Sequence, residues 1–81
     1  GQPAAPAQPI QTVNDKTFIW RDGVWTDTSF QPDTMQTEKV AFLSDAYFDL
    51  LEQKPALGDY FALGERVIVV LDGVAYEVVA E

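Results

Sequence analysis

The chain contains no cysteine and no histidine, and these absences exclude much of the chemistry that small proteins commonly use. Without cysteine there is no disulfide framework and no thiol nucleophile. Because the chain has neither cysteine nor histidine, an ordinary zinc or haem site is excluded as well. Histidine is also the side chain best suited to act as a general base near neutral pH. We therefore expect no metal, no cofactor and no enzymatic activity. The absence of cysteine leaves the redox compartment open.

Basic residues are scarce as well. Five Lys and Arg stand against 13 Asp and Glu, which gives a net charge of −8 in 81 residues. Because the few cations are scattered and the net charge repels phosphate, we expect no nucleic-acid partner. No window approaches the roughly 20 apolar residues of a membrane span, and no signal-peptide pattern is visible, so we expect no membrane insertion. A chain of this length forms one domain at most.

Residues 1–12 are expected to be a linker, and residues 13–81 a single folded domain. The first 11 residues contain three of the five prolines and no charge. Prolines at every third position favour extended polyproline II geometry. We interpret the segment as a tether to a preceding domain, and the chain as a terminal fragment of a larger protein. A proline-rich recognition ligand is the alternative, although no basic residue flanks the prolines.

Two Asp-Gly pairs predict two β-hairpins, because glycine accepts the positive φ that tight hairpin turns require. The first pair is Asp22-Gly23. With a two-residue turn, Trp20 lies opposite Trp25 and Phe18 shares their face. A three-residue turn would shift the pairing by one residue and move Trp25 to the other face, and the sequence leaves both registers open.

The second pair, Asp72-Gly73, joins the β-rich runs 66–71 and 74–79. A two-residue turn here makes one face of the hairpin wholly apolar and the other face partly so, which predicts a central position in the sheet. The apolar face consists of Val67, Val69, Leu71, Val74, Tyr76 and Val78.

The segment between the hairpins predicts one strand and two helices. A third strand is expected over 37–43, followed by a helix over 45–53 with Ser44 as its N-cap and a hydrophobic staple between Leu43 and Phe48. A second helix is expected over 55–62, with Gly64 as a left-handed residue beyond its end. The predicted core combines the apolar faces of these elements: Val69, Leu71, Val74, Tyr76, Tyr47, Leu50, Leu51 and Phe61.

These elements predict an α+β fold, with about five mostly antiparallel strands and two short helices on one sheet face. No dense cluster of carboxylates or activated serines is apparent. Asp27-Thr28-Ser29-Phe30-Gln31 contains part of an Asp-x-Ser-x-Ser metal motif, but Gln31 replaces the second serine. Both Asp-Gly pairs lack the partner carboxylates of a calcium loop.

The aromatic residues are the remaining feature, at 12% of the chain. Most of them are expected in the core. The first hairpin can instead present Phe18, Trp20 and Trp25 as an interaction surface, either to stack sugar rings or to anchor a protein partner.

Three strings carry a family resemblance: residues 16–27 (KTFIWRDGVWTD), residues 44–51 (SDAYFDLL) and residues 63–73 (LGERVIVVLDG). Together they resemble the small C-terminal module of bacterial surface or secreted proteins that carry a VIT domain and a von Willebrand factor A domain, a layout similar to inter-alpha-trypsin inhibitor heavy chains. The resemblance implies an accessory domain whose parent's adhesive metal site lies elsewhere. It implies no functional residue in this segment.

We therefore expect a non-catalytic structural or interaction module of a larger extracellular or cell-surface protein, although the composition leaves a cytoplasmic location open. Its partners would be upstream domains of the same chain or another protein. The alternative is a glycan-binding module with Trp20 and Trp25 as its platform.

Overall fold

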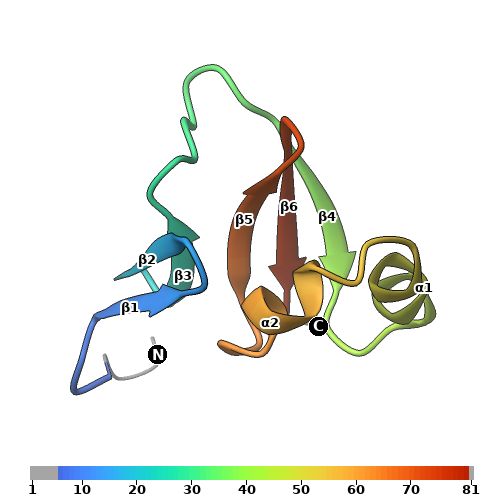
Figure 1. Ribbon diagram of the computed structural model, residues 1–81, viewed down its shortest axis with the longest axis horizontal. Helices are drawn as coiled ribbons and strands as arrows, with labels where there is room; N and C mark the ends of the chain where they lie inside the picture. The colour runs from blue at the N-terminus through green and yellow to red at the C-terminus, as the bar shows by residue number, and fades with distance from the viewer. Residues whose placement is uncertain (1–5, 81) are drawn as a thin grey trace.

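The computed structural model describes residues 6–80, so the first five residues of the expected linker lie outside the described part. The fold is α+β, with one mixed six-stranded sheet and two short helices (Figure 1). The sheet order is β1-β2-β3-β5-β6-β4. The elements are β1 (Ile10–Val13), β2 (Lys16–Arg21), β3 (Val24–Asp27), β4 (Thr37–Ala41), α1 (Asp45–Gln53), α2 (Leu57–Phe61), β5 (Val67–Leu71) and β6 (Val74–Val79).

Both predicted hairpins form with two-residue turns. Trp20 pairs with Trp25 across β2 and β3, and Leu71 pairs with Val74 across β5 and β6. Each turn has positive φ at both of its residues, with 51° and 82° at Asp22-Gly23 and 53° and 81° at Asp72-Gly73. Two consecutive positive φ values are typical of the type I′ turn, whose twist matches that of the flanking strands.

The sheet has one strand more than the sequence predicts. β1 begins at Ile10, within the expected linker, and pairs antiparallel with β2 from Ile10 opposite Ile19 to Val13 opposite Lys16. It is a short edge strand, and Ile10 is 59% exposed. A strand of this kind is ordered by hydrogen bonds to its neighbour. It has no continuous apolar run of its own, so the sequence pattern does not mark it as a strand.

The sheet is also less antiparallel than predicted. The pairings of β3 with β5 and of β4 with β6 are both parallel. Local residue patterns specify each hairpin. The pairing of β3 with β5 depends instead on how the chain between these strands, which includes both helices, folds back on itself. β5 and β6 are central in the sheet, as their apolar faces predict.

The helices differ in how far they enter the core. Ser44 caps α1 as predicted, because its Oγ accepts the Tyr47 N–H at 3.2 Å. Only Tyr47 of α1 is buried, whereas the shorter α2 buries Leu57, Tyr60 and Phe61. The Leu43 and Phe48 side chains, predicted to form a staple, remain more than half exposed.

The core is built mainly on one face of the sheet. Of the predicted core residues, Val69, Tyr76, Tyr47 and Phe61 are buried, while Leu71, Val74, Leu50 and Leu51 are half-buried against them. The sequence prediction omitted Phe18, Trp25, Val40, Leu57, Tyr60, Val67 and Val78, which are also buried in this cluster.

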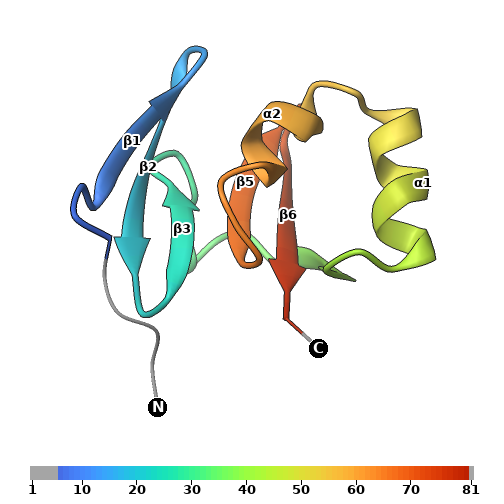
Figure 2. The same cartoon turned by 90° about the horizontal axis from the view of Figure 1, so that it is seen from below.

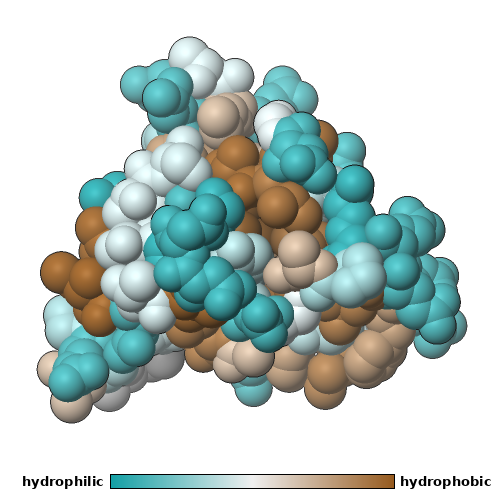
Figure 3. Space-filling view, viewed as in Figure 1, coloured by the Kyte–Doolittle hydropathy of each residue, from teal (hydrophilic) through white to brown (hydrophobic). Residues whose placement is uncertain are grey.

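Different segments of the chain pack on the two faces of the sheet. α2 packs over β5, and Figure 2 shows it against that strand, with α1 beyond β6. In the space-filling view, hydrophobic atoms gather over β5 and β6, and hydrophilic atoms lie around them (Figure 3). On the other face, Phe30 and Pro32 from the β3–β4 loop line a hollow with Val24 and Ile68. Within residues 6–80, no helix has both the length and the apolar character needed to span a bilayer.

Candidate interaction site

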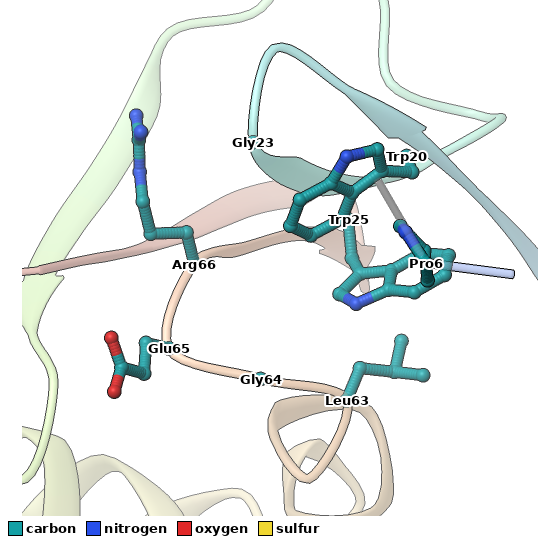
Figure 4. A pocket seen from close by; sticks show the side chains of 8 residues that line it. All are labelled: Pro6, Trp20, Gly23, Trp25, Leu63, Gly64, Glu65 and Arg66. Carbon is teal, nitrogen blue, oxygen red and sulfur yellow. The ribbon is translucent and has the colours of Figure 1, made fainter. Parts of the chain in front are cut away.

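A groove of about 400 Å³ lies where the first hairpin meets the loop between α2 and β5 (Figure 4). Its lining comes from the N-terminal segment, β2, β3, the turn that joins them, and the α2–β5 loop. The residues are Pro6, Trp20, Gly23, Trp25, Leu63, Gly64, Glu65 and Arg66. The groove therefore brings together residues up to 60 positions apart in the sequence.

The two tryptophans form one wall of the groove. Their pairing in the hairpin places the ring centroids 5.3 Å apart, with an angle of 65° between the ring planes. Trp25 is only 7% exposed and belongs to the core, while Trp20 is half-buried against it. The pair therefore presents one indole edge against one indole face, not two coplanar rings.

Backbone hydrogen bonds fix the segments around this wall. The Trp20 N–H donates to the Pro9 carbonyl at 2.8 Å, which joins the N-terminal segment to β2. The Trp25 N–H donates to the Arg66 carbonyl at 3.0 Å, which joins β3 to the chain entering β5. The groove is thus held by sheet-like bonds on two sides.

Gly64 has a role that the sequence analysis did not assign. It is not among the residues with positive φ, so the predicted left-handed helix cap is wrong. A Cβ at this position would lie 3.5 Å from Trp25 Cδ1 and 3.8 Å from Trp25 Nε1. A Cβ here would therefore make ordinary contact with the indole, and glycine leaves that part of the ring uncovered.

The groove is apolar near the indoles and charged at its rim. Figure 4 shows the Glu65 and Arg66 side chains directed away from the two tryptophans, whereas Leu63 lies on the side of Trp25. Glu65 is exposed and Arg66 is half-buried. An occupant would therefore meet rings and aliphatic carbon at the centre, and one charge of each sign at the edge.

Phe18 does not belong to this surface, which corrects the predicted trio of aromatic residues. It shares a sheet face with the tryptophans but is fully buried, with its ring centroid 5.6 Å from that of Tyr60 on α2. The sequence showed that Phe18 faces the tryptophan side, but it did not show that α2 covers that position.

Asp27 is the one buried charged residue between residues 6 and 80, and it is the centre of a polar cluster separate from the groove. Its Oδ1 accepts the Ser29 N–H at 2.9 Å and the Ser29 hydroxyl at 2.8 Å. Its Oδ2 accepts the Val70 N–H at 2.9 Å and lies 3.0 Å from Lys16 Nζ. Burial raises the Asp27 pKa, but these hydrogen bonds together outweigh it and hold the pKa below its usual value.

This cluster accounts for the partial metal motif noted in the sequence. Asp27 and Ser29 do come together, and the Lys16 ammonium supplies the positive charge beside the carboxylate. Across the described residues, no group of three or more Asp or Glu is placed to hold a metal ion. The Ser44 hydroxyl is committed to α1, since it donates to the Ala41 carbonyl at 2.7 Å and accepts from Tyr47.

Comparison with known proteins gave no match to any family model, curated protein or solved structure.

Proposed function

We propose that the chain is a non-catalytic interaction module that docks a protein segment in the Trp20–Trp25 groove. The observation that carries this proposal is the composition of the groove, in which two indoles and Leu63 form an apolar centre held by backbone bonds. Large amphipathic rings in a preformed groove are typical anchors of protein interfaces. The residues that line the groove offer no nucleophile with an activating base, so binding alone is the activity that they support.

A protein segment fits the groove better than a sugar. Stacking of a pyranose ring requires an open, flat indole face. Trp25 is 7% exposed, and the two rings meet at 65°, so only Trp20 offers part of a face. A glycan platform remains the second candidate, because Glu65 and Arg66 at the rim could bond sugar hydroxyls.

The setting that we propose is an accessory domain of a larger bacterial surface or secreted protein. The support is the resemblance of residues 16–27, 44–51 and 63–73 to the C-terminal module of proteins with VIT and von Willebrand factor A domains. The partner would then be an upstream domain of the same protein or a separate protein.

Site-specific photocrosslinking tests the proposal. A photoreactive amino acid replaces Glu65, which is exposed at the groove, or Glu52, which is exposed on α1 and serves as the matched control. In cells that produce the protein, we expect a specific protein adduct from position 65 that position 52 does not give. The adduct should disappear when Trp20→Ala is added. The same adducts from both positions would refute a docking role for the groove.

Oligosaccharide titration separates the second candidate. Chitohexaose and cellohexaose are added to the labelled chain while the two indole N–H signals are followed by NMR. We expect no shift. Saturable shifts confined to Trp20 and Trp25 would replace the protein-docking proposal with the glycan-binding one.

A further inference from the structure

We propose that the groove recognises a proline-rich segment, and that residues 6–9 of this chain are its resident, intramolecular ligand. The inference rests on the proposed function, in that the groove is the docking surface, and it adds the chemical class of the ligand. It also gives the N-terminal prolines a role beyond that of a spacer.

The first observation is that Pro6 lines the groove together with both tryptophans (Figure 4). Pro6 is half-buried, although it lies four residues before the first strand. A proline ring is rigid and apolar, and its tertiary amide has no N–H to satisfy. Proline-rich segments dock in aromatic-lined grooves for these reasons, and they lose little conformational entropy when they bind.

The second observation is a specific anchor at the other end of the segment. The Pro9 carbonyl accepts the Trp20 N–H at 2.8 Å, and the next residue begins β1. The chain bends over residues 7–9, where Gln11 Nε2 also donates to the Gln8 carbonyl at 3.3 Å. This anchored bend carries Pro6 back to the groove that contains the indole of Trp20.

The third observation is charge. The first 11 residues carry no ionisable side chain, in a protein of net charge −8. A neutral proline segment is therefore not repelled by the acidic surface, unlike the acidic remainder of the chain. The apolar centre of the groove needs no charge on its occupant, because its charged residues lie at the rim.

A tethered ligand competes strongly with any external one. A short linker keeps a segment at an effective concentration of roughly millimolar beside its site. The apparent affinity of an external proline-rich peptide would then be its intrinsic affinity multiplied by the fraction of time for which the groove is free. Weakening the resident segment should therefore increase the affinity of the peptide.

The experiment compares the full chain with its Pro6→Ala variant, and uses Thr12→Ala as the matched control because Thr12 is exposed in the adjoining strand β1, outside the docked segment. Two readouts are followed: acrylamide quenching of tryptophan fluorescence, and the two indole N–H signals in NMR. The peptide probe is GQPAAPAQP, the sequence of residues 1–9, and its control has alanine at all three prolines. Unchanged amide signals of Val69 and Val78 report an intact core.

We expect Pro6→Ala to increase quenching and to shift both indole signals, while Thr12→Ala leaves them unchanged. The probe peptide should shift the same signals, and its apparent Kd should fall about tenfold in Pro6→Ala if the segment fills the groove about 90% of the time. Equal behaviour of the two variants, or equal effects of the two peptides, would overturn the inference. Indole shifts that depend on protein concentration would overturn its intramolecular part, because a second copy would then supply the segment.

The two proposals fail separately. A protein adduct at position 65 with no preference for prolines refutes only the ligand class. Proline-dependent peptide binding with no specific adduct at position 65 refutes only the docking of a protein partner.

Discussion

The Asp27 side chain accepts a backbone N–H of the neighbouring strand, as a backbone carbonyl does elsewhere in a sheet. The parallel pairing of β3 with β5 extends over only two residue pairs, Trp25 with Val67 and Thr26 with Ile68. Beyond them, the Asp27 carboxylate accepts the Val70 N–H at 2.9 Å. The buried charge is tolerated because Lys16 and Ser29 complete its shell of donors.

Replacement of Asp27 tests this role through the pH dependence of stability. Because the folded-state pKa is lowered, the carboxylate contributes stability that is present above the unfolded pKa of about 3.9 and is lost as the pH falls below it. We expect Asp27→Asn to reduce the free energy of unfolding by about 2 kcal/mol at pH 7. Urea unfolding between neutral and acid pH measures the effect, and the loss should shrink as the pH falls from the unfolded pKa through the folded pKa.

Lys16→Met is the matched control for Asp27→Asn. It leaves the carboxylate with its Val70 and Ser29 donors but without a nearby cation, so the folded-state pKa should rise, and the stability lost on acidification should be smaller and complete at a higher pH than in the parent chain. Parallel stability curves for the parent and Asp27→Asn at every pH would show that the carboxylate charge is not involved.

Leu43 is strained, which makes it a second test at the residue scale. Its φ is +63°, and its side chain is 57% exposed between β4 and α1. A residue with a Cβ costs about 1–2 kcal/mol in this region, which exceeds the roughly 0.5–1 kcal/mol of extra entropy that glycine loses on folding. We expect Leu43→Gly to stabilise the protein by about 0.5–1 kcal/mol in urea unfolding. Leu43→Ala keeps the strain and is the control, so equal midpoints for the two variants would contradict the account.

At the scale of elements, the shorter helix contributes more to the core. α2 has five residues and buries three of them, and Leu57 is fully buried. α1 has nine residues and buries only Tyr47, whose ring stacks on Phe61 of α2 with a centroid distance of 5.4 Å. α1 is therefore attached to the core through Tyr47 and the half-buried Leu50 and Leu51, whereas α2 is part of it.

Alanine substitutions should separate the two helices. Leu57→Ala removes a fully buried side chain, so we expect a loss of about 3–5 kcal/mol. Leu50 on α1 is half-buried, and Leu50→Ala should cost only about 1–2 kcal/mol. Chemical denaturation of both variants measures the difference. An equal or larger loss for Leu50→Ala would reverse the ranking of the helices.

The elements that the sequence predicts well are those specified by neighbouring residues. The Asp-Gly pairs predict both hairpins, although the sequence left the register of the first one open, and Ser44 marks the start of α1. β1 and the two parallel pairings depend on partners far along the chain, and no local pattern encodes them. For the same reason Trp20 and Trp25 were identified from the sequence, while Pro6, Leu63 and Gly64 were recognised as groove residues only from the structure.

At the scale of the whole molecule, the sheet consists of two parts, the antiparallel β1-β2-β3 and the mixed β5-β6-β4, which are joined at β3 and β5. The join has few hydrogen bonds, with the Trp25 N–H on the Arg66 carbonyl at one end and the Val70 N–H on Asp27 at the other. The hydrophobic core crosses the same join, because Phe18 and Trp25 belong to one cluster with Val67 and Tyr60. Burial on this scale stabilises by more than the few bonds that the join lacks.

Native-state hydrogen exchange should therefore show one cooperative unit across the join. The Trp25 and Val70 amides should exchange with the same free energy of opening as those of Val69 and Val78, whose side chains are fully buried in the centre of the sheet. Gln11 and Val13 in the edge strand should exchange faster, through local fraying. If β2 and β3 opened as a separate unit, the Trp25 amide would exchange at a clearly lower free energy than Val78. In that case the Phe18 contact with Tyr60 would be too weak to couple the two parts of the sheet.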